Sequence, residues 1–302
     1  MYTRNVFLPL IVILILLTSC GAPGTPPPTS VPPSTATFAP TAAPTLTATP
    51  PPTPSPLPSL PPPTGTQCDT LDLSDDLITG FSVETTHPIN QREYGCLVVS
   101  GDDGFPVLAG KQSFRIEVRP GDCSASSGWD DCPNDRSRHE IQEREGTCDG
   151  EAAIYEANYY VPYQPKFKPR GDNIMFIGQM NTADPDYFGT LIYLEVDNDQ
   201  NLLLRTHKGF SWDIDRQVVA ARDIFERWIN LRYEVYAATD ATGYFRVYVD
   251  DQLVLSESRP TIPSEQGCLG LRVGIYNAFI SEAGEAFESQ VIFVDQLRKY
   301  QE

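Results

Sequence analysis

The segment that most constrains the fold is residues 228–255, in which two alternating runs flank a turn signal at 239–243. Regular alternation of apolar and polar residues is typical of a β-strand with two unlike faces. We therefore expect an antiparallel hairpin with one aliphatic face and one face of tyrosine, arginine and glutamate. Such a sheet buries its aliphatic face against a second sheet and offers the other face to solvent or to a ligand.

The polar face of this hairpin carries Arg246 and Tyr248. Flat aromatic rings stack on sugar rings, and arginine binds a carboxylate through two parallel hydrogen bonds. Both residues are therefore candidates for binding a sugar substrate. The hairpin alone favours an ordinary solvated face of a β-sandwich, and the two interpretations stay open.

The first twenty residues have the pattern of a targeting segment. Arg4 precedes an apolar run over 6–17 that is too short for a comfortable membrane span. The run ends L-T-S-C at Cys20, which resembles the bacterial lipoprotein signal. The resemblance implies cleavage before Cys20, its lipidation, and firm anchoring at the cell surface by several acyl chains. A plain secretory signal is the alternative, and either one takes the mature chain out of the cytoplasm.

Residues 21–66 are predicted to be a disordered linker. They are nearly all Pro, Thr, Ala and Ser and carry no charge, so they cannot bury enough apolar surface to fold. Proline at this density favours the polyproline II conformation, at about 3.1 Å per residue, and a reach on the order of 100 Å. The linker would lift the folded domain away from the membrane.

The remaining residues, 67–302, have the size of one large all-β domain. This region holds 21 basic and 40 acidic residues, because Arg4 is the one charged residue that precedes it. Such an acidic balance argues against binding of nucleic acid. An anionic substrate would need a locally basic groove. Candidate basic residues are Arg115, Arg119, Arg136, Arg138, Lys166, Lys168 and Arg170.

Six cysteines remain after Cys20, and an even number in an exported domain predicts three disulfides. Cys123 and Cys132 bracket a short Ser/Gly/Asp loop and are the pair we favour. No CxxC pair or histidine spacing indicates a metal site, so we expect no cofactor. Structural calcium stays open, since acidic pairs on turns supply hard oxygen ligands. Those pairs are Asp197 with Asp199 and Asp213 with Asp215.

Strand-like runs separated by turn residues dominate the domain, whereas helix-period segments are scarce. Many short strands with regular turns predict a sandwich or jelly roll. The segment 218–227 is open between a short helix and a loop. The predicted strands besides the hairpin are 113–118, 153–161, 173–181, 190–196, 202–206, 269–276 and 290–298.

The order of several short motifs resembles the jelly-roll polysaccharide lyases of the heparin lyase I, glucuronan lyase and alginate lyase group. The resemblance covers most of residues 108–300. It implies an all-β, concanavalin A-like jelly-roll sandwich of two antiparallel sheets that holds an acidic polysaccharide and cleaves it by β-elimination. The motifs are K-Q-S-F-R-I-E-V-R-P-G-D, R-S-R-H-E, Y-x-x-x-x-Y-V-P, I-G-Q-M-N, W-I-N-L-R-Y-E-V, G-Y-F-R-V-Y-V-D-D, L-R-V-G-I-Y-N and V-D-Q-L-R.

Elimination requires a group that neutralises the uronate carboxylate, a base for the C5 proton and an acid for the leaving O4. The family places these groups in an Arg-x-Glu, a Gln-x-His and a Tyr-x-Lys-x-Gly strand. Here Arg138 and Glu140 match the first strand, and Gln179 matches the glutamine of the second. The third strand is matched by Arg272 and Gly274.

Two positions depart from this pattern, because Asn181 stands for the histidine and Gly270 for the tyrosine. Asparagine cannot accept a proton near neutral pH. The candidate substitutes are His139, Tyr193, Tyr248 and Tyr276, but His139 alternates with Arg138 and Glu140 and should face away from them. We therefore predict Arg138, Gln179, Asn181 and Tyr276 as catalytic residues, the first three as the groups that bind the uronate carboxylate. The predicted substrate-binding residues are Arg115, Glu140, Arg246, Tyr248 and Arg272.

Other functions stay open beside a lyase. A glycosidase of the laminarinase type needs Glu-x-Asp-x-x-Glu, but the run from Glu195 and Asp197 ends at Gln200 and lacks the last carboxylate. A glycan-binding domain without catalysis and a laminin-G-like adhesive module are the further alternatives. We expect a monomer whose partner is an acidic polysaccharide and whose contact with the membrane is the lipid anchor alone.

Overall fold

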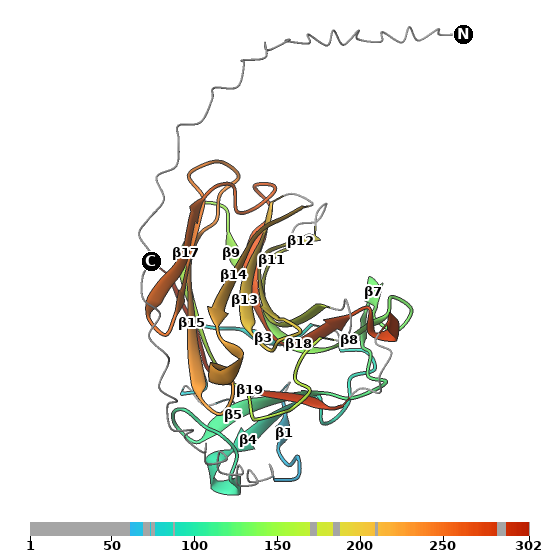
Figure 1. The fold of residues 1–302 in the computed structure, drawn as a ribbon. Helices are drawn as coiled ribbons and strands as arrows, with labels where there is room; N and C mark the ends of the chain where they lie inside the picture. Colours follow the sequence, from blue (N-terminus) through green and yellow to red (C-terminus); the bar gives the residue numbers. More distant parts are fainter. Residues whose placement is uncertain are drawn as a thin grey trace, which may run out of the picture. The chain divides into compact units, whose positions relative to one another are not determined.

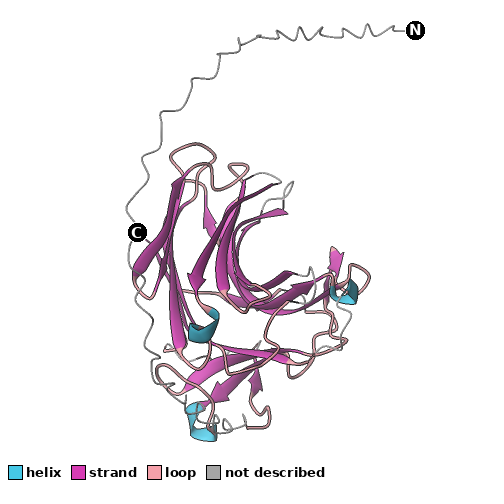
Figure 2. Ribbon diagram, in the orientation of Figure 1, coloured by secondary structure: helices cyan, strands magenta, loops and turns pink. Residues whose placement is uncertain are grey.

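Two β-sheets packed face to face form the folded part of the chain (Figure 1; Figure 2). The computed structural model describes residues 61–68, 73, 76–86, 88–169, 174–183, 188–208, 211–282 and 288–301. All strand pairs of the two sheets are antiparallel except β2 with β19. The predicted all-β jelly-roll sandwich is therefore confirmed.

The first sheet has the order β1-β4-β5-β19-β10-β15-β16-β17, with β2 beside β19. Its strands are β1 (Thr66–Gln67), β2 (Ile78–Thr79), β4 (Cys96–Ser100), β5 (Gln112–Val118), β10 (Ala152–Tyr160), β15 (Trp228–Tyr236), β16 (Tyr244–Val249), β17 (Gln252–Ser258) and β19 (Gln290–Gln301).

The second sheet has the order β14-β13-β12-β11-β18-β8-β3, with β9 beside β18. Its strands are β3 (Val83–Thr85), β8 (Arg136–Glu143), β9 (Thr147–Cys148), β11 (Ile174–Ala183), β12 (Phe188–Val196), β13 (Leu202–Lys208), β14 (Ser211–Val219) and β18 (Cys268–Ala278). In Figure 1 this sheet is curved, and a small ribbon of β6 (Ala125–Ser126) and β7 (Trp129–Asp130) stands on its open side.

Helical structure in the described ranges is confined to the 3₁₀ turns η1 (Gly101–Asp103), η2 (Ala221–Asp223) and η3 (Ile280–Glu282). None of these is long or apolar enough to cross a membrane. The signal segment and the linker up to residue 60 lie outside the described residues.

The predicted hairpin is present as β15 and β16, paired from Leu231 with Val249 to Tyr236 with Tyr244. Its aliphatic face is fully buried in the main hydrophobic core, where it packs against the inner face of the second sheet. Residues of that opposite face include Met175, Leu194 and Val273. Burial of one face of each sheet therefore produces the core, as the alternation predicted.

Three disulfides join the six cysteines of the domain and confirm the predicted framework. They link Cys68 to Cys96, Cys123 to Cys132 and Cys148 to Cys268. The second closes the base of the β6–β7 ribbon, and the third joins β9 to β18.

The turn at Asp197 is held by hydrogen bonds to the chain itself. Its carboxylate accepts from the backbone N–H groups of Asp199 and Asn201 and from the Asn201 amide. Within the described residues no cluster of three or more His, Cys, Asp or Glu side chains could hold a metal ion. The side chains of Asp213 and Asp215 lie outside the described part of the structure.

Candidate functional site

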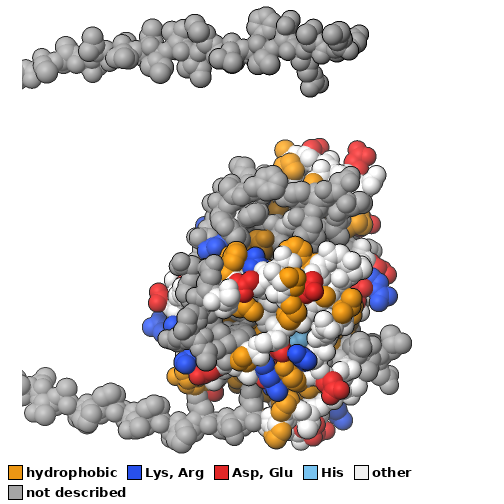
Figure 3. All heavy atoms as spheres, turned by 90° about the vertical axis from the view of Figure 1, so that its right-hand side faces the viewer, with side chains coloured by type: hydrophobic (Ala, Val, Ile, Leu, Met, Phe, Trp, Pro, Cys, Tyr) orange, Lys and Arg blue, Asp and Glu red, His pale blue; other side chains and the backbone are white. Residues whose placement is uncertain are grey.

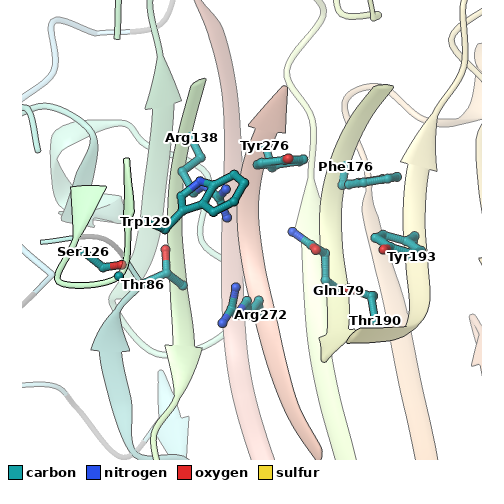
Figure 4. Close-up of a pocket in the computed structure, with 11 residues that line it drawn as sticks. Thr86, Ser126, Trp129, Arg138, Phe176, Gln179, Thr190, Tyr193, Arg272 and Tyr276 are labelled. Carbon is teal, nitrogen blue, oxygen red and sulfur yellow. The ribbon is translucent and has the colours of Figure 1, made fainter. Parts of the chain in front are cut away.

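A cavity of about 630 Å³ lies on the outer, curved face of the second sheet, between its strands and the β6–β7 ribbon (Figure 4). Figure 3 shows acidic, basic and hydrophobic side chains interspersed on the side of the molecule towards which the curved sheet opens. The residues that line the cavity include Thr86, Trp129, Arg138, Phe176, Gln179, Thr190, Tyr193, Arg272 and Tyr276.

Strand pairing arranges these side chains in two rows across the sheet. Residues that are register partners on neighbouring strands lie side by side on one face. One row runs Gln142, Arg272, Gln179, Tyr193 and Arg205, from β8 to β13. The other row runs Arg138, Tyr276, Phe176 and Glu195. A polymer that crosses the strands would therefore meet polar and aromatic groups in sequence.

A bulge in β11 places Phe176 and Gln179 on the same face, although they are three residues apart. The register shift falls between Phe176 and Gly178. A side chain at Gly178 would point into the core, where its Cβ would lie 2.7 Å from the Tyr159 hydroxyl. Glycine is therefore required here, and the bulge supplies the cavity with one aromatic and one amide group.

Arg138 is held on the cavity wall by two buried carboxylates. Its Nε and Nη2 donate to Asp131 at 2.8 Å each, and its Nη1 donates to Glu140 at 3.3 Å. Burial lowers the pKa of Arg138, but Glu140 and Asp131 outweigh burial and hold this pKa above its ordinary value. Glu140 in turn accepts from the Gln179 amide at 2.6 Å. Arg138 is therefore a fixed, charge-compensated group.

Asn181 lies against Arg272. With the amide oxygen towards the guanidinium, it accepts from Nε at 3.0 Å and from Nη1 at 3.2 Å, and its nitrogen donates to the Thr190 hydroxyl. Burial lowers the pKa of Arg272, and Arg138 adds to this effect while Glu140 opposes it. An arginine stays charged at neutral pH even so. Asn181 thus orients a partly buried cation, a role that needs no basic group.

Tyr276 occupies the middle of the second row. The Arg138 guanidinium lies 4.2 Å from the centroid of its ring, and Phe176 stacks parallel to it at 5.8 Å. Phe176 also contacts Tyr193, with ring centroids 4.3 Å apart. Burial raises the pKa of Tyr276, whereas Arg138 and Arg136 act to lower it. The arrangement holds a phenol in fixed orientation beside positive charge.

Gly274 lies between Arg272 and Tyr276 on β18, where the backbone of the neighbouring strand β8 leaves no room for a side chain. Its φ of +147° and a distance of 2.3 Å from a hypothetical Cβ to the His139 carbonyl exclude any side chain. Gly270 stands on the same face beside Asn181, where a Cβ would meet the Glu143 carbonyl at an ordinary 3.6 Å. A side chain could therefore be accommodated at the position that the Tyr-x-Lys-x-Gly pattern gives to tyrosine.

The structure brings together most of the predicted site residues. Arg138, Glu140, Gln179, Asn181, Arg272 and Tyr276 share the outer face of the second sheet. His139 faces the other way, as the alternation predicted, with its Nε2 3.5 Å from the Asp122 carboxylate.

Three predicted substrate-binding residues lie on the first sheet and not in this cavity, so their role in substrate binding stays a prediction. Arg115 on β5 is buried and pairs with Glu117 at 2.8 Å. Arg246 and Tyr248 on β16 both contact Glu234 at 3.2 Å, on the solvated face of the hairpin. Alternation identified that face as polar, but it could not show which sheet carries the cavity.

The sequence reasoning missed Trp129, Asp131 and Phe176. Trp129 and Asp131 lie inside the loop that Cys123 and Cys132 close, and a tryptophan in a short disulfide loop was the available signal. Phe176 was not predicted because of the bulge in β11. Strict alternation from Gln179 would place Phe176 on the opposite face of the strand.

The fold and the site define an all-β jelly-roll sandwich with a polar and aromatic cavity across its curved sheet. The chain matches the family described as Polysaccharide lyase over residues 103–298, and it therefore belongs to that family. No curated protein matches the sequence.

Solved structures support the same fold. Endo-β-1,4-glucuronan lyase from the fungus Trichoderma reesei is 14% identical, with a TM-score of 0.50 over 78% of this chain and 92% of the other. A family 7 alginate lyase in complex with product is 9% identical, with a TM-score of 0.50 over 73% of this chain and 95% of the other. At these identities the similarity establishes the fold.

Proposed function

We propose that this protein cleaves a uronic-acid polysaccharide by β-elimination in the cavity on its second sheet. Family membership supports a lyase, and the similar solved structures are lyases of glucuronan and alginate. The observation that carries the proposal is that Arg272 and Tyr276, both on β18, line this one cavity. A pyranose ring bound between these two side chains would have a cation on one side and a phenol on the other.

In the proposed reaction Arg272 binds the uronate carboxylate, oriented by Asn181, with the Gln179 amide beside it. Charge neutralisation there stabilises the enolate-like charge that develops as the C5–H bond breaks. Tyr276, as the phenolate, takes the C5 proton. The C4–O4 bond then breaks, a C4=C5 double bond forms, and the phenol returns the proton to the leaving O4.

Arg138 has a supporting role in this scheme. Its hydrogen bonds to Asp131 and Glu140 fix it over the Tyr276 ring, where its positive charge favours the phenolate. This assignment differs from the sequence-based expectation that Arg138 binds the substrate carboxylate directly.

The proposal extends to the location of the protein. We propose that Cys20 carries the lipid anchor and that residues 21–66 form the stalk from which the lyase domain reaches its polymer. The lipoprotein-like L-T-S-C run and the uncharged Pro/Thr composition support this part.

Incubation with glucuronan, alginate and a neutral glucan tests the proposal, with the ultraviolet absorbance of the unsaturated product as the readout. Absorbance should rise with a uronate polymer alone, and Tyr276→Phe should abolish the rise while Tyr300→Phe, at an exposed position on β19, leaves it unchanged. Binding of a uronate polymer without any rise would instead support a non-catalytic glycan-binding domain.

A further inference from the structure

We propose that the disulfide-closed β6–β7 ribbon is part of the substrate site, with Trp129 stacking on a sugar ring and Asp131 positioning Arg138. The inference rests on the proposed function of the same cavity and deepens it. Neither residue belongs to the three strand motifs that indicated the site.

The ribbon is a fixed wall of the cavity. Its strands pair Ala125 with Asp130, and the Cys123–Cys132 disulfide closes its base. Ala125 also exchanges both backbone hydrogen bonds with Ile89, at 2.8 and 2.9 Å. These ties hold the ribbon from two sides, so the residue at its tip keeps a defined orientation over the sheet.

Trp129 projects from this wall with 45% of its surface exposed. Its indole N–H donates to Asp131 at 2.8 Å, which satisfies the polar group and fixes the ring. Figure 4 shows the indole at the cavity, next to Arg138 and pointing towards Tyr276. A large, oriented apolar ring that contributes little to the core is suited to stack on the C–H face of a pyranose.

Asp131 connects the indole with Arg138. This carboxylate is fully buried and accepts two hydrogen bonds from Arg138, one from Trp129 and one from the Ser124 hydroxyl at 3.3 Å. Arg138 in turn lies over Tyr276. The ribbon therefore fixes both a stacking surface for the substrate and the cation next to the proposed acid and base.

The ligand implied for Trp129 is a pyranose unit of the polymer, recognised by its apolar face and not by its charge. The opposite wall of the cavity already carries Phe176, Tyr193 and Tyr276. A sugar chain in this cavity would therefore have aromatic surfaces on the sheet side and on the ribbon side.

Titration calorimetry and tryptophan fluorescence with a glucuronan oligosaccharide and with a neutral gluco-oligosaccharide test the role of Trp129. Trp129→Ala should weaken binding about threefold to tenfold, as expected for loss of an aromatic stack, whereas Trp129→Phe should retain most of the affinity. The matched control is Trp228→Phe on the first sheet, where Trp228 packs against Tyr160 with ring centroids 5.4 Å apart.

Addition of the oligosaccharide that wild type binds should change the tryptophan fluorescence of wild type and of Trp228→Phe. It should not change the tryptophan fluorescence of Trp129→Phe. Unchanged affinity of Trp129→Ala for every oligosaccharide that wild type binds would overturn the stacking role. If wild type binds the neutral oligosaccharide alone, the uronate proposal fails, yet Trp129 is still tested on that ligand.

Asp131→Asn tests the positioning role, because it keeps the shape and removes the charge next to Arg138. We expect kcat to fall at least tenfold with little change in KM. The alkaline rise of the rate should also move to higher pH, because Arg138 is no longer held over the Tyr276 ring, where its charge favours the phenolate. A loss of activity with an unchanged pH profile would overturn the role. Should this variant not fold, Cys123→Ser/Cys132→Ser opens the ribbon instead, and it should show the weakened binding of Trp129→Ala.

Discussion

Replacement of Arg138 by alanine should destabilise the domain far more than its position on a cavity wall suggests. Arg138 is 7% exposed, and its partners Asp131 and Glu140 are 0% and 1% exposed. The substitution leaves two buried carboxylates without their cation, and removal of one partner of a buried ion pair costs about 3–5 kcal/mol. At about 2–4 °C per kcal/mol for a domain of this size, the melting temperature should fall by roughly 6–20 °C.

Thermal and urea unfolding at acid and neutral pH provide the assay for Arg138→Ala. Protonation of the orphaned carboxylates relieves the penalty, so the difference from wild type should narrow at acid pH. A second change, Asp131→Asn in the Arg138→Ala background, should restore part of the lost stability, and the double-mutant cycle measures the coupling.

The matched control for this prediction is Arg246→Ala. Arg246 also bonds a glutamate, Glu234 at 3.2 Å, but it does so on the exposed face of the hairpin. Exposed ion pairs contribute little, so this variant should unfold like wild type. If Arg138→Ala also unfolds like wild type but loses affinity for uronate, Arg138 is a substrate ligand and the reasoning here is refuted.

Three further predictions follow from the same structure. The value of kcat/KM should rise with pH up to and beyond 10, because the base form of Tyr276 is the phenolate and burial holds its pKa above the ordinary value of 10.0; a rate that is flat from pH 6 to pH 10 would exclude Tyr276 as the base. Loss of the Cys148–Cys268 disulfide, which joins residues 120 apart, should lower the free energy of unfolding by about 2–5 kcal/mol in urea titrations of Cys148→Ser/Cys268→Ser. Cys20→Ser should release the protein from the membrane fraction or leave an unprocessed precursor, and wild-type fractionation of this variant would contradict lipidation at Cys20.

Strand alternation and cysteine count were sufficient to predict most of the fold. The predicted strand 113–118 is β5, and 269–276 lies within β18. β4 and β14 were both missed. The segment of β14 mixes charged and apolar residues at the edge of the sheet, where pairing with β13 supplies hydrogen bonds that β-propensity does not indicate. The segment 218–227 instead holds the end of β14 and the short turn η2.

The sequence predicted which site residues share a face within one strand, but not which strands come together to form the site. Alternation placed Arg138 and Glu140 on one face and His139 on the other, which the structure shows. Which strands meet across the sheet depends on long-range pairing, so alternation could not show that Arg246 and Arg138 lie on different sheets. The Asp131 carboxylate, which determines what Arg138 can do, belongs to a loop that no periodic pattern describes.

The central claim, elimination by a tyrosine-based site, is tested most directly by mass spectrometry of the products that wild type releases from glucuronan. Elimination predicts oligosaccharides with an unsaturated uronate at the new non-reducing end, each one water lighter than the product of hydrolysis, and none from Tyr276→Phe. Saturated products would contradict the account in favour of a glycosidase, and an intact polymer in complex with the protein would contradict it in favour of a binding domain.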